Sequence, residues 1–146
     1  MTADPALVAD FAADYADAFR VAAGDGHTAR GWAETSLAGA QTAGGVFARI
    51  AWHGLLGFDL APRGAAGTVV GWRVSVDEPQ RCVLDVDGRL MAGRIAFVLA
   101  DGAVTWTTML RYHRPAGGRV WAVAGHLHRT LTPRCLNAAG RALADR

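Results

Sequence analysis

The sequence predicts an α+β domain in which an antiparallel β-sheet curls around a long C-terminal helix. Two observations lead to this prediction. Apolar and polar residues alternate between residues 68 and 113, which is the period of a strand with one buried face. Apolar residues then recur at spacings of three and four over residues 118–144, as in an amphipathic helix. Because both apolar faces avoid water, we expect them to pack together.

The composition is typical of one folded domain. The chain has 146 residues, of which 51% are hydrophobic and 19% charged, so we expect a single domain over 1–146 with its core in 13–143. The formal net charge of +2 offers no strong field for nucleic acid. No signal-peptide pattern and no run of about twenty apolar residues is present, so we expect a cytoplasmic protein without a membrane span.

A strand and two helices are expected before the main sheet. Residues 13–22 alternate in the manner of a strand, with Asp17 as a polar exception on the apolar side. Thr28 is a candidate N-cap for a short helix that reaches Leu37. Apolar residues at helical spacing predict a second helix over residues 45–58.

Four strands joined by short turns are expected between Thr68 and His113. The turn signals are Glu78-Pro79, Asp87-Gly88 and Asp101-Gly102, and Asp-Gly favours tight hairpins because glycine accepts a positive φ. One face of this meander is apolar and the other is expected in water. The apolar face comprises Val70, Trp72, Val74, Val76, Cys82, Leu84, Val86, Met91, Gly93, Ile95, Phe97, Leu99, Val104, Trp106, Thr108, Leu110 and Tyr112. The polar face comprises Arg73, Ser75, Arg81, Asp85, Arg94, Thr105, Thr107, Arg111 and His113.

The C-terminal helix is expected to cover the apolar face of the sheet. Pro133 should kink this helix or restart it with Thr132 as the cap. Such a sheet can hold its covering helix away from its centre, which leaves a cavity between them. The expected buried stripe comprises Val120, Ala124, Leu127, Leu131, Cys135, Ala138 and Ala142, with Trp121 and His128 beside it.

Three segments carry a resemblance to a known family. They are Gly67-Thr-Val-Val-Gly-Trp-Arg-Val, Asp87-Gly-Arg-Leu-Met-Ala-Gly-Arg and Trp106-Thr-Thr-Met-Leu-Arg-Tyr. With the order of elements, they resemble a bacterial family of uncharacterised domains in the START-like (SRPBCC, polyketide-cyclase-like) superfamily, over about residues 13–143. The resemblance implies a helix-grip fold with a hydrophobic cavity. That superfamily includes lipid carriers, hormone receptors, cyclases and dehydratases, so the fold alone does not assign an activity.

Motifs for several common chemistries are missing from the sequence. It contains no G-x-G-x-x-G and no phosphate-binding loop, so no cofactor is expected. It also contains no G-x-S-x-G, the motif of a serine-hydrolase nucleophile. His126 and His128 point about 200° apart on a helix and cannot hold one metal ion. The cysteines Cys82 and Cys135 lie far apart and fit no metal or disulfide scaffold. No metal site is therefore expected.

The candidate ligand-binding residues line the expected cavity. His128 could act there as an acid, a base or a hydrogen-bond donor, or could simply be packed against a backbone carbonyl or water. Thr108 could contact a ligand or bond within the sheet, and the aromatic residues could be plain core. His53, in the second predicted helix, is either a ligand contact or a surface residue. The candidates are Trp72, Met91, Phe97, Trp106, Thr108, Tyr112, Trp121 and His128.

Three functional hypotheses follow from this pattern. The preferred one is a binding module that takes a small hydrophobic or amphipathic molecule in the cavity. The second is an enzyme of cyclase or dehydratase type that uses His128, helped by Tyr112 or Thr108. The third is an interaction domain with a closed core, which acts through a homodimer or another partner. No catalytic residue is assigned from the sequence.

Overall fold

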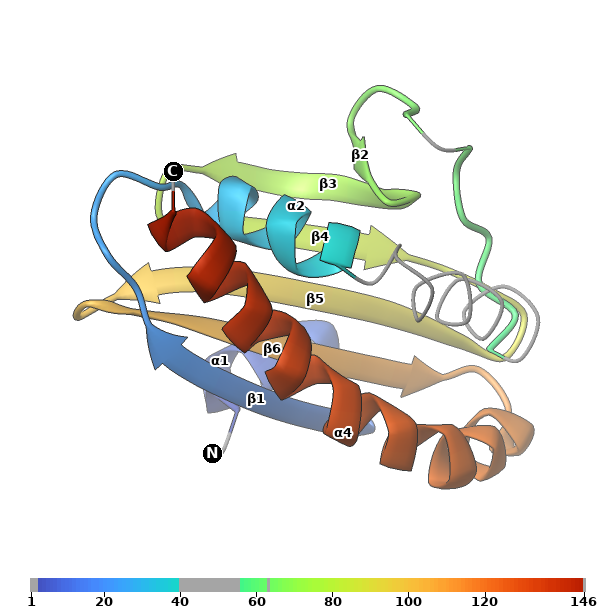
Figure 1. Cartoon of the computed structure of the whole chain (residues 1–146). Helices are drawn as coiled ribbons and strands as arrows, with labels where there is room; N and C mark the ends of the chain where they lie inside the picture. Colours follow the sequence, from blue (N-terminus) through green and yellow to red (C-terminus); the bar gives the residue numbers. More distant parts are fainter. Residues whose placement is uncertain (1–2, 40–55, 63, 146) are drawn as a thin grey trace.

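The computed structural model describes residues 3–39, 56–62 and 64–145 of the chain, and six of its strands form one sheet. Figure 1 shows the long helix α4 lying across this sheet. The predicted α+β class, with the sheet wrapped against a long C-terminal helix, is confirmed. The elements are α1 (Pro5–Phe11), β1 (Tyr15–Ala22), α2 (Ala29–Gly39), β2 (Thr68–Val69), β3 (Trp72–Glu78), β4 (Arg81–Val86), β5 (Met91–Ala100), β6 (Ala103–Tyr112) and α4 (Pro115–Ala144).

The sheet is antiparallel, and the predicted first strand joins it at one edge. The strand order is β1-β6-β5-β4-β3-β2, so β1 pairs with β6. The predicted tight turn at Asp101 and Gly102 is confirmed, because Ala100 pairs with Ala103 across it. The two turn residues have φ of 54° and 71°, the positive values that a type I′ hairpin needs. Thr28 begins α2 as predicted, since its Oγ1 accepts a hydrogen bond from the Gly31 N–H at 3.0 Å.

The predicted first strand of the meander is in fact a hairpin. Strands β2 and β3 pair with each other, and Val70 and Gly71 turn the chain between them with φ of 46° and 90°. The turn points Val69 into the core, whereas Val70 is only half-buried. A register shift between Val74 and Val76 then moves Val76 to the opposite face of the sheet. The expected alternation from Thr68 to Val76 is therefore wrong at both ends.

The turn at Asp87 and Gly88 is not a tight hairpin. Gly88 instead forms a β-bridge with Phe58, and a Cβ on Gly88 would lie 2.2 Å from the Gly57 carbonyl oxygen. The glycine is needed there for close approach of two backbones and not for a positive φ. Most of the predicted helix over 45–58, with His53, lies outside the described residues. Its last part is not helical, because Phe58 belongs to this bridge.

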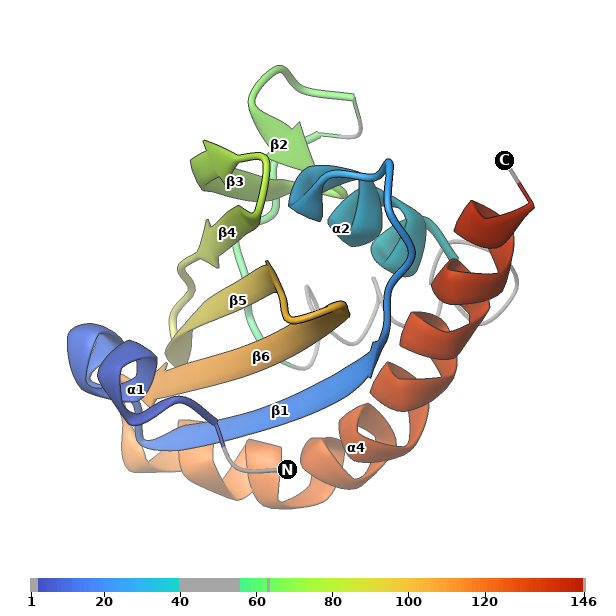
Figure 2. The same cartoon turned by 90° about the vertical axis from the view of Figure 1, so that its left-hand side faces the viewer.

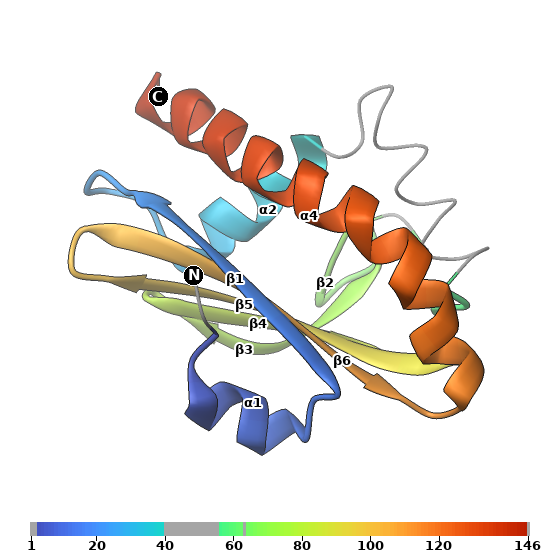
Figure 3. The same ribbon diagram turned by 90° about the horizontal axis from the view of Figure 1, so that it is seen from below.

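The outer face of the sheet is partly covered by α1, which the sequence analysis did not predict. Figure 3 shows α1 on one side of the sheet and α2 with α4 on the other. Asp4 caps α1 by accepting a hydrogen bond from the Ala6 N–H at 2.9 Å, and Pro5 opens the helix. Phe11 then packs into a second core, so the expectation of a wholly wet face is wrong. That core also contains Val83, Ala92, Ala96 and Met109, and Thr107 is buried nearby.

Helix α4 runs unbroken past Pro133 and buries a different stripe from the predicted one. Thr132 is buried within the helix and does not start a new one. Leu127, expected in the core, is 40% exposed. At the start of the helix the backbone comes close to the segment before β5, because a Cβ on Gly117 would lie 2.6 Å from the Leu90 carbonyl oxygen. The buried residues are Gly117, Trp121, Gly125, Thr132, Leu136, Ala139 and Leu143.

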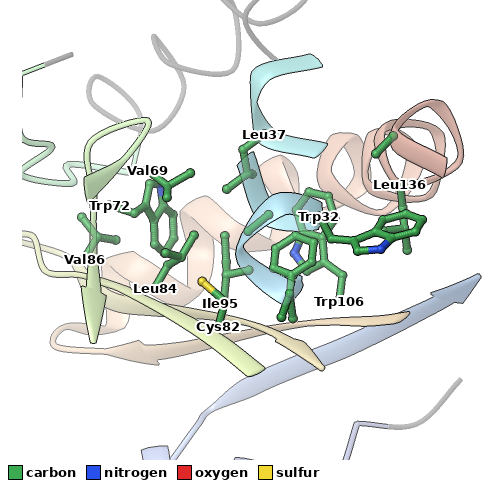
Figure 4. Close-up of a cluster of buried hydrophobic side chains, with 14 of the residues drawn as sticks. Trp32, Leu37, Val69, Trp72, Cys82, Leu84, Val86, Ile95, Trp106 and Leu136 are labelled. Carbon is green, nitrogen blue, oxygen red and sulfur yellow. The ribbon is translucent and has the colours of Figure 1, made fainter. Parts of the chain in front are cut away.

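The main core lies between the sheet, α2 and α4. Figure 4 shows side chains from the strands and from both helices converging there. Trp72 and Trp106 are 2% and 4% exposed, so both point away from water as predicted. The members labelled in the figure are Trp32, Leu37, Val69, Trp72, Cys82, Leu84, Val86, Ile95, Trp106 and Leu136.

Candidate functional site

Polar side chains meet where β1 packs against α4, on the apolar side of the sheet. We call Tyr15, Asp17, Trp121, His128 and Thr132 the seam cluster. The first two share a face because they lie two residues apart on a strand. The other three lie seven and four residues apart on α4, which places them on one side of the helix. Figure 2 shows how α4 follows β1.

A chain of short contacts joins the seam cluster. The Tyr15 hydroxyl donates to Asp17 Oδ2 at 2.6 Å. The same oxygen lies 3.0 Å from His128 Nε2, and Thr132 Oγ1 lies 3.2 Å from His128 Nδ1. The side chains of Asp17 and His128 are only 13% and 17% exposed. A carboxylate and an imidazole are thus held together at the edge of the core.

The ring of Trp121 and the guanidinium of Arg129 also contact residues of the seam cluster. The ring of Trp121 lies 5.1 Å from that of His128 and 5.2 Å from that of Tyr15, measured between centroids. Arg129 Nη1 donates to the Tyr15 hydroxyl at 3.2 Å, and its guanidinium lies 5.9 Å from the centre of the Tyr15 ring. The Tyr15 hydroxyl therefore both donates and accepts within the protein.

Tyr15 is expected to ionise well above the normal range. Burial first, and then the hydrogen bond to Asp17, raise the pKa of Tyr15 to about 12. Because the folded-state pKa lies above the unfolded value near 10, the stabilising contribution of Tyr15 is complete below about pH 10. It is lost as the pH rises through about 12. Ultraviolet titration of the phenolate should show this late ionisation.

The matched control for this titration is Tyr15→Phe, which leaves Tyr112 as the single tyrosine. Subtracting its titration curve from that of the native chain isolates the Tyr15 signal. Burial also raises the pKa of Tyr112, so the subtraction is needed to separate the two phenols. A difference curve centred near pH 10 would show that Tyr15 is not held in the seam cluster.

Several buried polar atoms, some in the seam cluster and some on α2, have no hydrogen-bond partner among the described residues. They include Asp17 Oδ1 and Trp121 Nε1 in the cluster, and Trp32 Nε1 and Ser36 Oγ on α2. His128 Nε2 is also without an aligned partner: its distance to Asp17 Oδ2 suits an ion pair, but the direction of the bond does not suit a hydrogen bond. Native proteins leave few buried polar atoms unpaired. Three of these atoms, Asp17 Oδ1, Trp121 Nε1 and His128 Nε2, belong to the seam cluster, which makes the cluster a candidate site.

Five of the eight predicted site residues lie in the seam cluster or beside it. Trp121 and His128 belong to the cluster, and Phe97, Trp106 and Thr108 form a second group. Phe97 and Trp106 have ring centroids 5.0 Å apart, and Trp106 Nε1 donates to Thr108 Oγ1 at 3.1 Å. Thr108 pairs directly with Asp17 across the sheet, which places this group next to the group of Trp121 and His128.

Three other predicted residues lie apart from the seam cluster. The ring of Trp72 packs against Phe58, with their centroids 5.5 Å apart. Met91 and Tyr112 are paired near the start of α4, where a Cβ on Gly118 would lie 3.2 Å from the Tyr112 ring. Of the eight candidates, Tyr112 and His128 are half-buried and the other six are buried.

Sequence analysis missed Asp17 and Tyr15 as site residues. Asp17 was noted only as an exception within an apolar strand face. A charged residue in the buried phase of a strand is itself a signal, because buried carboxylates almost always have a partner. The partners could not be identified from the sequence, since His128 lies 111 positions further along the chain.

Two pockets of about 610 Å³ each are lined by no residue of the seam cluster. One is on the outer face beside α1, where Arg94 pairs with Asp85 at 2.6 Å and with Asp10 at 3.2 Å. The other is at the C-terminal end of α4, where His27 Nε2 lies 3.0 Å from the Leu143 carbonyl oxygen. Neither pocket is lined by any of the eight predicted site residues.

Neither a metal site, a membrane helix nor a known relative points to a functional class for the described residues. Among the described residues, no group of three or more His, Cys, Asp or Glu is placed to hold a metal ion. None of the helices in the described ranges has the length and hydropathy needed to cross a membrane. Comparison with models of protein families matched no family, and comparison with curated proteins found no relative.

Proposed function

We propose that the protein binds a small amphipathic molecule between the sheet and α4, with the polar group of the ligand at the seam cluster. The observation that supports this most directly is the pair of unpartnered buried atoms, Asp17 Oδ1 and Trp121 Nε1, beside an apolar interior. Each unpaired buried polar group costs about 1–3 kcal/mol, which a ligand that bonds to it would recover. The resemblance to the START-like superfamily stays a prediction and agrees with this proposal.

The apolar part of the ligand would lie along one side of α4. The stripe that the sequence placed in the core is only half-buried or exposed, although three of its members pack against the main core. An apolar strip that stays partly open beside a core offers a surface for the apolar part of a ligand. These residues are Val120, Ala124, Leu127, Leu131 and Cys135.

The proposal predicts saturable binding of a neutral apolar dye. Nile red should bind the folded chain at one site with a rise in fluorescence, and native mass spectrometry should detect small molecules that copurify with the protein. Ala124→Trp should weaken dye binding at least about tenfold, because the indole would occupy the position beside α4 where the apolar part of the ligand is proposed to lie. Asn137→Phe is the matched control, since Asn137 lines the pocket at the other end of α4.

Two results would contradict the proposal. The first is a native chain that neither binds Nile red saturably nor carries a small molecule after purification. The second is loss of dye binding in Asn137→Phe but not in Ala124→Trp, which would move the site to the end of α4. Thermal unfolding of both variants checks that they are folded. A chain that binds no ligand and elutes as a dimer would support the interaction-domain hypothesis instead.

A second candidate function is acid–base catalysis on the bound molecule. The 3.0 Å contact between Asp17 and His128 favours it, because a carboxylate beside an imidazole is an arrangement used in acid–base catalysis. Against it, His128 Nδ1 is already in contact with the Thr132 hydroxyl at 3.2 Å, so only Nε2 remains for a ligand. The mass of a ligand recovered after incubation separates the two functions. An unchanged mass supports binding alone, and conversion that His128→Gln abolishes supports catalysis.

A further inference from the structure

The hydrogen-bonding capacity left open in the seam cluster defines which head group a ligand can bring. Tyr15 has none left, because its hydroxyl donates to Asp17 Oδ2 and accepts from Arg129. Its raised pKa keeps the phenol protonated at neutral pH, so the donation to Asp17 persists. Asp17 Oδ1 is buried and accepts no bond from any described residue. One strong acceptor therefore remains open.

His128 supplies the matching donor. Nε2 lies 3.0 Å from a carboxylate oxygen, so we assign the proton of the imidazole to Nε2, because two acceptors at this distance would repel each other. Nδ1 then accepts from the Thr132 hydroxyl, which lies at 3.2 Å. The Nε2–H direction misses Asp17 Oδ2, so this proton also has no aligned acceptor among the described residues. An open acceptor and an open donor thus belong to two side chains that touch each other.

We infer that the seam cluster recognises the hydroxyl group of a neutral alcohol with an apolar body. This inference rests on the proposed ligand-binding function. Within the described part of the chain, the cluster also leaves the Trp121 Nε1 donor open. A hydroxyl donates one hydrogen bond and accepts up to two, so a single oxygen can donate to Asp17 Oδ1 and accept from His128 Nε2 and Trp121 Nε1. The apolar body would then continue over the ring of Trp121 and along α4.

Charged head groups fit the same atoms poorly. A carboxylate has only acceptors and would place a second negative charge beside the buried carboxylate of Asp17. The cation nearest to the cluster, Arg129, already donates to Tyr15, so it does not offset that repulsion fully. An ammonium has only donors and would leave the His128 proton unpaired.

Competition among three ligands with the same alkyl chain tests the inference. Decanol, decanoate and decylamine are each titrated against Nile red bound to the native chain at neutral pH. Decanol should displace half of the dye at a concentration at least about tenfold lower than either charged ligand. In Asp17→Asn the advantage of decanol over decanoate should shrink at least about threefold, because the like charge is gone. Asn137→Phe should keep the native order.

The outcomes separate the inference from the function on which it rests. If Nile red does not bind, the proposed function itself fails. If the dye binds but decanoate or decylamine displaces it as well as decanol does, the hydroxyl inference is overturned and the binding function stands. Displacement by none of the three ligands also overturns the inference. The ranking on the native chain decides the question even if Asp17→Asn is unfolded.

Discussion

Replacing Trp106 by alanine is expected to destabilise the protein by about 3–5 kcal/mol, the usual cost of removing a buried tryptophan. The side chain is 4% exposed and its ring lies 5.0 Å from that of Phe97. The change also leaves the buried Thr108 hydroxyl without its indole donor. Chemical denaturation of both proteins, followed by far-ultraviolet circular dichroism, measures the difference in the free energy of unfolding.

The matched control for Trp106→Ala is Val123→Ala on α4. Val123 is 74% exposed, so this substitution should change the free energy of unfolding by less than about 0.5 kcal/mol. A cost below about 1 kcal/mol for Trp106→Ala would mean that Trp106 does not fill the core. That result would contradict the packing of the sheet against the two helices.

Gly88→Ala is expected to destabilise the protein by about 1–3 kcal/mol or more, the cost of forcing extra atoms into a packed site. The new Cβ would lie 2.2 Å from the Gly57 carbonyl oxygen and 3.0 Å from Phe58 Cα. These are backbone atoms, so the segment around Phe58 has to move away from β4 and β5. Phe58 is 1% exposed and packs on Trp72, so the movement disturbs the core.

Gly24→Ala is the control for this substitution. A Cβ on Gly24 meets no atom within 4 Å and its φ is not positive, so alanine should be neutral or slightly stabilising. Thermal unfolding of the two variants under one set of conditions gives the comparison. Equal melting temperatures would show that the bridge between Phe58 and Gly88 is not formed in solution.

Local sequence signals predicted most elements of the fold but not their ends. The strand at 13–22, the helix after Thr28 and the hairpin at Asp101-Gly102 each follow from a short-range rule, and the structure confirms them. Helix α1 also had such a signal, Asp4 followed by Pro5, but its seven residues are too few for a clear period. The hairpin between β2 and β3 was missed because Val70 is β-branched and rarely takes a positive φ.

The stripe of α4 that faces the core could not be predicted from hydrophobicity. Every member of the predicted stripe is apolar, yet the stripe that the helix buries includes Gly117, Gly125 and Thr132 beside its apolar residues. Glycine contributes little to hydrophobic periodicity, but it lets a helix backbone approach a strand closely. The face of α4 that is buried therefore depends on the shape of the sheet surface against which the helix packs.

The sequence alone determined the α+β class, the order of most strands and the meeting of an apolar sheet face with an amphipathic C-terminal helix. These features depend on local periods of two and of three to four residues, which act wherever apolar groups leave water. Only the tertiary structure decided that Asp17 lies against His128 and that α1 covers the outer face. Such contacts join residues far apart in the chain, so they depend on the register and rotation of packed elements, which no local period encodes.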